Sequence, residues 1–92
     1  MPKSKLQQQL DTHRQLIHSE NLKVTSHVQR EQGDWILNTL MIDKYSVPFK
    51  YKRKKLYRIL TGQKVNLTYY PEVETIAGFQ IEVMKVVRVK VA

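Results

Sequence analysis

The segment that decides the fold is residues 64–70, which read Lys64-Val65-Asn66-Leu67-Thr68-Tyr69-Tyr70. Apolar side chains recur at every second position, at Val65, Leu67 and Tyr69. Successive side chains of a β-strand point to opposite faces of a sheet, so apolar residues with a period of two line one buried face. This segment is therefore predicted to be a strand that packs one face against a core.

The same pattern continues on both sides of this segment. It predicts four further strands, at residues 22–29, 35–42, 47–52 and 79–91. Residues 35–42 are apolar on both faces, which is typical of a strand covered from two sides. Pro48 cannot donate to a ladder, so it marks either an edge strand or the start of one. Residues 84–86 interrupt the last alternation and predict a β-bulge or a bend, and residues 71–78 are predicted to be a loop.

Two segments have the period of a helix instead. Ser4 and Gln7 form a capping-box pattern, and an amphipathic helix is predicted from residue 4 to residue 19. Its narrow apolar stripe contains Leu6, Leu10, His13 and Ile17. A second, short helix is predicted between Lys54 and Leu60, because Leu56, Ile59 and Leu60 have the spacing i, i+3 and i+4 and Gly62 can cap the end.

The predicted architecture is mainly β with an N-terminal α-helix, in a single domain of 92 residues. Residues 1–20 form the helix, and residues 22–92 form a small five-stranded barrel or curved sheet with a short helix between the third and fourth strands. This order is that of an OB-fold barrel, and an SH3-like barrel or an open, curved sheet also fits it. The predicted core contains Val24, Val28, Trp35, Leu37, Leu40, Phe49, Leu67, Phe79, Ile81 and Val83.

Composition and motifs argue against catalysis. The chain has no cysteine, three histidines that share neither a helix face nor a strand, and three isolated glycines. It therefore lacks a predicted metal site, a Gly-x-Ser-x-Gly elbow and a phosphate-binding loop. Glu72 and Glu74 are expected to be solvated acids in a loop. We predict a protein that is not an enzyme and has no cofactor.

The sequence pattern also predicts neither a membrane-spanning helix nor a signal peptide. No stretch approaches the roughly 18 apolar residues that a membrane helix needs. The first nine residues lack the apolar core of a signal peptide. Together with the absence of disulfides, this predicts a cytoplasmic protein.

The net charge of +8 is distributed unevenly along the chain. Residues 1–43 have equal numbers of acidic and basic side chains, so the whole excess lies in residues 44–92. Between Lys44 and Lys64 there are eight basic residues and no acidic one. A one-sided excess of this kind suggests a polyanionic partner, and a solvated surface that keeps the protein soluble is the alternative.

Aromatic residues are interleaved with this basic run, which favours nucleic acid as the partner. Cations neutralise phosphates and release counterions, while aromatic faces stack on bases. Phe49 and Tyr51 alternate with the lysines and should therefore point into the core. The candidate phosphate contacts are Lys50, Lys52, Arg53, Lys54, Lys55 and Arg58, and the candidate stacking residues are Tyr45 and Tyr57. The expected partner is RNA or single-stranded DNA.

A protein-interaction module is the alternative function. The helix predicted at residues 4–19 has a narrow apolar stripe and a glutamine-rich back, so it can dock on a protein partner or pair with its own copy. The sequence leaves the oligomeric state open.

Overall fold

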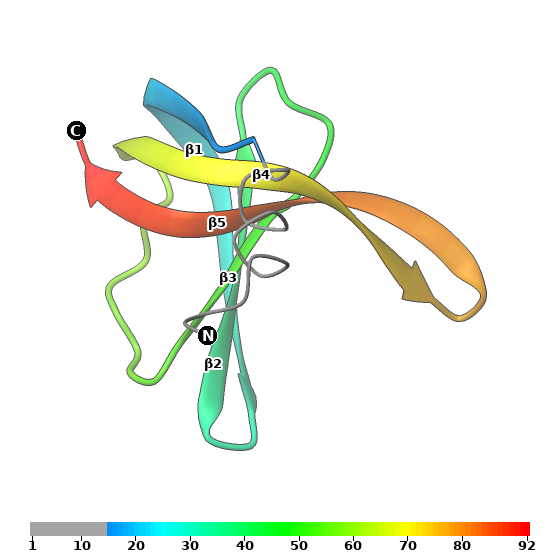
Figure 1. The fold of residues 1–92 in the computed structure, drawn as a ribbon. Helices are drawn as coiled ribbons and strands as arrows, with labels where there is room; N and C mark the ends of the chain where they lie inside the picture. The colour runs from blue at the N-terminus through cyan, green and yellow to red at the C-terminus, as the bar shows by residue number, and fades with distance from the viewer. Residues whose placement is uncertain (1–14) are drawn as a thin grey trace, which may run out of the picture.

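The computed structural model of the chain describes residues 15–92. These residues form a closed barrel in which the strands follow one another in the order β1-β2-β3-β5-β4 (Figure 1). The five strands are β1 (Ile17–Gln32), β2 (Trp35–Ile42), β3 (Phe49–Arg53), β4 (Lys64–Ile76) and β5 (Phe79–Val91). The prediction of a mainly β chain with one five-stranded sheet is confirmed, and residues 15–92 contain no α-helix.

The barrel closes through one short parallel pair. Strand β3 pairs with β5 only through Phe49 with Met84 and Lys50 with Lys85, whereas every other neighbouring pair is antiparallel and longer. Pro48 lies immediately before β3, where its carbonyl accepts a hydrogen bond from the Met84 N–H at 2.9 Å. Of the two positions predicted for Pro48, the strand start is therefore the one observed.

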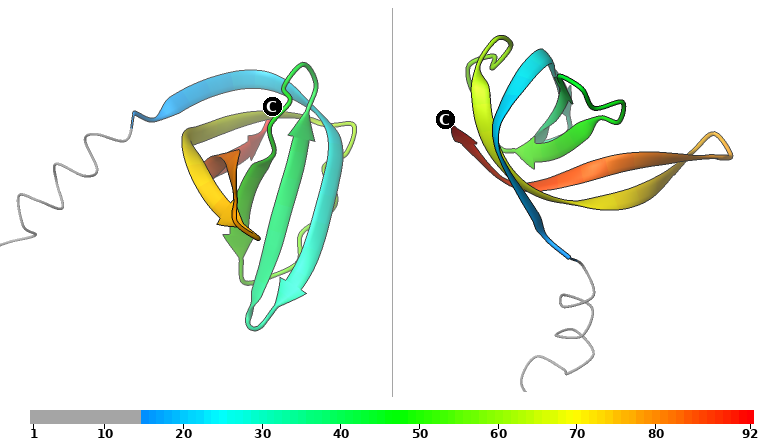
Figure 2. Two further views of the ribbon diagram at one scale, coloured as in Figure 1. Left: turned by 90° about the vertical axis from the view of Figure 1, so that its right-hand side faces the viewer. Right: turned by 90° about the horizontal axis from the view of Figure 1, so that it is seen from above.

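Two hairpins extend from the barrel as separate arms (Figures 1 and 2). We define the β1–β2 arm as residues 28–39 and the β4–β5 arm as residues 71–84. The predicted loop at 71–78 is wrong, because β4 continues to Ile76 and a two-residue turn follows. In that turn Ala77 and Gly78 both have positive φ, at 51° and 84°. Two successive positive φ angles are the mark of a type I′ turn, whose twist matches that of a hairpin.

The main core lies inside the barrel. Its buried residues are Val24, Leu40, Ile42, Phe49, Leu60, Val65, Leu67 and Tyr69. Four predicted core residues, Val24, Leu40, Phe49 and Leu67, are confirmed among them, and Val83 is also fully buried. Phe49 packs edge-on against Tyr69, with ring centroids 4.9 Å apart.

A bulge in β1 explains one error in the predicted core. The register passes from Val24 opposite Ile42 to Ser26 opposite Met41, so Thr25 is an extra residue. One inserted residue reverses which side chains face inward. His27 is consequently buried, and Val28, predicted to be in the core, is 52% exposed. Another bulge, in β5, leaves Val87 without a partner on β4, one residue beyond the predicted interruption at residues 84–86.

Four other residues of the predicted core lie on the arms. Trp35 and Leu37 belong to the β1–β2 arm, and Phe79 and Ile81 to the β4–β5 arm. Trp35, Phe79 and Ile81 are exposed, and Leu37 is half-buried. Alternation predicted strands correctly at these positions, but the strands run past the end of the barrel, where no interior remains to receive their apolar side chains.

A buried polar network replaces the short helix predicted between Lys54 and Leu60. Nδ1 of His27 accepts the Leu60 N–H at 2.9 Å, so Nε2 carries the proton and donates to Oδ1 of Asn38 at 2.8 Å. Gln29 donates to the carbonyl of Tyr57 at 3.0 Å. Because the network fixes residues 57–60 in an irregular conformation, only Leu60 of the predicted apolar face is buried.

The predicted N-terminal helix is contradicted where the structure describes it. Ile17, His18 and Ser19 belong to β1 and pair with Tyr69, Thr68 and Leu67 of β4. Residues 4–14 of that helix, and the protein-interaction surface predicted on it, lie outside the described residues.

Candidate functional site

A cleft of about 690 Å³ lies between the two arms. All five strands contribute to its lining, which consists of Val28, Arg30, Gln32, Leu37, Asn38, Thr39, Lys50, Tyr51, Lys52, Tyr70, Glu74, Ile76, Lys85, Val86 and Val87. Four of these side chains are basic and one is acidic. The cleft therefore has a positive net charge and a mixed polar and apolar surface.

One carboxylate holds two lysines where the arms meet. Glu74 accepts from Lys85 at 2.9 Å through one oxygen and from Lys50 at 3.0 Å through the other. These lysines face each other across the short parallel pair that closes the barrel. Hydrogen bonds from Lys85 and then Lys50 lower the pKa of the Glu74 carboxyl below its usual value of 4.5, against the opposing effect of burial. Glu74 thus joins the β4–β5 arm to the seam, by which we mean the short parallel pair of β3 and β5 that closes the barrel.

We expect Glu74→Gln to destabilise the protein at neutral pH by about 1 kcal/mol, the usual scale for a partly exposed ion pair. A lowered folded-state pKa stabilises the fold above the unfolded value of 4.5, and this stabilisation disappears as the pH falls through the lowered pKa. Urea unfolding of wild type and variant across this range measures the difference. It should be present at pH 7 and shrink in acid. A difference independent of pH would show that the ion pairs do not stabilise the arm.

The wall formed by β1, β2 and β3 carries most of the cleft's positive charge. Leu37 of β2 lies between Arg30 and Lys52, because it pairs with Arg30 of β1 on one side and with Lys52 of β3 on the other. Lys50 precedes Lys52 on the same face of β3. Arg30 and Lys52 are exposed and form no ion pair with another residue of the described part. Their charges are therefore available to a ligand.

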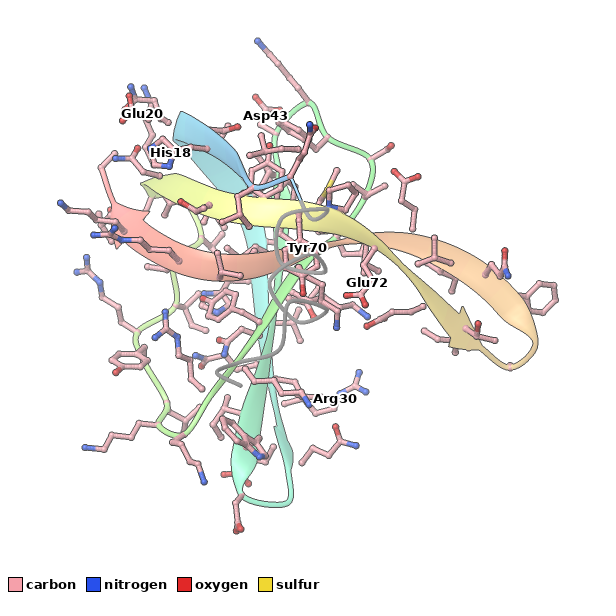
Figure 3. The ribbon with its side chains drawn as sticks, in the orientation of Figure 1. His18, Glu20, Arg30, Asp43, Tyr70 and Glu72 are labelled. Atoms are coloured by element: carbon pink, nitrogen blue, oxygen red, sulfur yellow. The ribbon has the colours of Figure 1, made fainter. Side chains whose placement is uncertain are left out.

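The opposite wall, formed by β4 and β5, has a different character. Tyr70, Glu74 and Ile76 line it from β4, and Lys85 is its one basic residue among those that line the cleft. Figure 3 shows Arg30 on one side of the space between the arms, and Tyr70 and Glu72 on the other. The cleft thus has one cationic wall and one wall of apolar, aromatic and carboxylate groups.

The structure distributes the predicted site residues over several surfaces. Lys50 and Lys52 line the cleft. Arg53, Tyr57 and Arg58 surround a second, more apolar hollow of about 320 Å³, together with Tyr51, Leu60, Val89 and Val91. The Arg53 guanidinium lies 5.4 Å from the Tyr51 ring and 5.9 Å from the Tyr57 ring. Burial raises the pKa of the Tyr51 hydroxyl, and Arg53 partly offsets this effect.

The other predicted site residues lie outside the cleft lining. The Lys54 ammonium is 4.6 Å from the centroid of the Trp35 ring. Lys55 is exposed in the segment after β3. Tyr45 packs edge-on against Phe49 at 5.3 Å, so much of its ring supports the core. The basic run is therefore not one continuous surface, because β3 ends at Arg53 and the chain turns away.

Sequence reasoning missed three side chains that complete the cleft. Arg30 lies just after the strand predicted at residues 22–29, Lys85 belongs to the predicted interruption at residues 84–86, and Tyr70 lies on the polar side of the strand predicted at residues 64–70. The sequence signal for Tyr70 is its alternation with the buried Leu67 and Tyr69, which places it on the outer face. Alternation gives no such signal for Lys85, because it places Lys85 on the same strand face as Val83, a predicted core residue. For Arg30 the signal depended on the bulge at Thr25, which the sequence does not mark.

Comparison with protein-family models, with curated proteins and with solved structures finds no match. Residues 15–92 contain no cluster of three or more histidine, aspartate or glutamate side chains placed to hold a metal ion. No helix in that range is long and apolar enough to span a membrane.

Proposed function

We propose that this chain is a small, non-enzymatic protein that binds nucleic acid in the cleft between its two arms. The order β1-β2-β3-β5-β4, with β3 parallel to β5, supports an OB-like barrel over an SH3-like one. OB-folds bind oligonucleotides on the face of strands 2 and 3, between the β1–β2 and β4–β5 loops. The absence of cysteine fits a reducing compartment, and we expect the protein to act in the cytoplasm.

The observation that carries the proposal is the coincidence of charge with that face. Arg30, Lys50, Lys52 and Lys85 all line the cleft, and it opens where OB-folds place their ligand. Fold and charge are independent features, since net charge does not determine a fold. Lysine and arginine contacts to phosphates bind without reading sequence, so we expect little dependence on base sequence.

Wild-type protein should bind a labelled oligonucleotide of about 15 nucleotides, a length within the range that one OB-fold covers. Fluorescence anisotropy at several salt concentrations tests this. Each neutralised phosphate on a single strand contributes about −0.7 to the slope of log K against log salt, so three or four contacts should give a slope of about −2 to −3. Failure to bind more tightly than about 100 μM near 0.15 M salt would overturn the proposal.

A further inference from the structure

Trp35 and Phe79 are exposed aromatic residues near the ends of the two arms. Trp35 is 42% exposed and Phe79 is 72% exposed. The register of the strands places both side chains on the faces of the arms that line the cleft. Trp35 pairs with Gln32, and Phe79 pairs with Ile76, and both partners line the cleft. Residues that pair across antiparallel strands share a face of the sheet, so each ring extends one wall of the cleft.

Neither ring belongs to the buried core of the barrel. Phe79 leaves most of its surface in water, and the type I′ turn beside it is formed by Ala77 and Gly78, so the turn places no demand on residue 79. Trp35 contacts the Lys54 ammonium, which lies 4.6 Å from its centroid. An exposed ring beside a cation is the combination that single-strand binding proteins use, because the ring stacks on a base and the cation meets the neighbouring phosphate.

The asymmetry of the two walls indicates the form of the nucleic acid. A single strand presents phosphates along one edge and bases along the other. The wall formed by β1, β2 and β3 offers Arg30 and Lys52 to the phosphates, while Lys50 is held by Glu74. The face of the β4–β5 arm toward the cleft offers apolar and aromatic groups together with Glu72, which pairs with Val83. A duplex would bring a second phosphate backbone against the Glu72 carboxylate.

We propose, building on the function proposed above, that the ligand is a single strand that runs from one arm to the other. Between the arms its phosphates follow Arg30 and Lys52, and its bases lie toward the β4–β5 arm. At one end of the cleft a base turns onto Trp35 of the β1–β2 arm, and at the other end a base stacks on Phe79 of the β4–β5 arm. The two rings that looked like core residues are thus the stacking residues, in place of Tyr45 and Tyr57.

Intrinsic fluorescence gives a direct test in the unmodified chain, since Trp35 is its one tryptophan. Titration with an unlabelled single-stranded oligonucleotide should quench this fluorescence, with the same midpoint as the anisotropy titration. A duplex of the same sequence should bind at least about tenfold more weakly. Binding without a change in Trp35 fluorescence, or equal affinity for the duplex, would overturn the inference.

Alanine variants test the two rings separately. Trp35→Ala and Phe79→Ala should each raise the Kd by about 5- to 160-fold and leave the salt slope unchanged, because stacking releases no counterions. Val73→Ala is the matched control on the β4–β5 arm. Val73 is 58% exposed, and it lies on the opposite face of the arm from Phe79, opposite Glu82. Tyr57→Ala is the aromatic control, and both controls should bind like the wild type.

The outcomes separate this inference from the function on which it rests. Salt-dependent binding that both ring variants retain would reject the stacking residues and leave the cleft's function in place. Equal losses in Tyr57→Ala and Trp35→Ala would also reject the assignment, since Tyr57 borders the second hollow. If the wild type does not bind the oligonucleotide at all, the proposed function itself is rejected. Trp35→Phe keeps a ring at that position and should restore most of the affinity if Trp35→Ala folds poorly.

Discussion

Replacing Phe49 by alanine should lower the free energy of unfolding by about 3–5 kcal/mol, the usual cost of removing a buried phenylalanine ring. Phe49 is fully buried and contacts two other rings edge-on, those of Tyr45 and Tyr69. Domains of this length have a free energy of unfolding of about 5–14 kcal/mol, so this substitution would remove a large part of the stability. The midpoint of thermal unfolding should fall by at least about 12 °C.

The position of Phe49 makes this loss more than a cavity effect. Phe49 with Met84 is one of the two pairs through which β3 and β5 close the barrel. The other pair, Lys50 with Lys85, holds the Glu74 carboxylate at the meeting point of the arms. A weakened seam should therefore reduce binding in the cleft as well as stability.

Phe79→Ala is the matched control, because it removes the same ring from a position that is 72% exposed. Exposed substitutions usually change stability by less than about 0.5 kcal/mol. Urea unfolding of both variants measures the contrast. If the two variants lose similar free energy, Phe49 is not the centre of the core that its burial implies.

Much of this fold follows from local patterns in the sequence. Alternation at Val65, Leu67 and Tyr69 identifies a strand with one buried face, and all three residues are buried. Alternation fails where the chain inserts a residue. The bulge at Thr25 moves His27 inward and Val28 outward, and no residue type in that segment marks the insertion.

The hydrophobic pattern of the sequence also does not indicate how far a strand extends beyond the barrel. Trp35 and Phe79 satisfy the pattern of a buried strand face, and only the three-dimensional length of the arms shows that water or a ligand covers them. The site has the same limitation. Lys50 and Lys52 follow from the basic run, whereas Arg30 and Lys85 join them through strand pairing between distant segments.

Reversing two charges on the cationic wall, in the variant Arg30→Glu/Lys52→Glu, should nearly abolish nucleic-acid binding. At about 0.05 M salt, a slope of −0.7 per phosphate makes each contact worth about eightfold in affinity, so two contacts are worth about 60-fold. Repulsion from the new carboxylates adds to this loss. The salt slope should become less negative by about 1.4.

The matched control is Arg88→Glu/Lys90→Glu. It changes the same residue types and removes the same four units of positive charge from the net +8, two at each reversed position. Arg88 and Lys90 are exposed on β5, and neither lines the cleft. Arg30 and Lys52 form no ion pair with another described residue, so their reversal should leave the fold intact, as circular dichroism can verify.

The contrast between the two variants distinguishes a site from a general attraction. Long-range attraction depends on total charge and decays over about 10 Å at 0.1 M salt, so it should fall equally in both variants. Contact with phosphates in the cleft depends on position and should fall mainly in Arg30→Glu/Lys52→Glu. Equal losses would mean that the charge excess attracts polyanions without a binding site. A larger loss in the control would place the site on the outer wall of β4 and β5, away from the two arms.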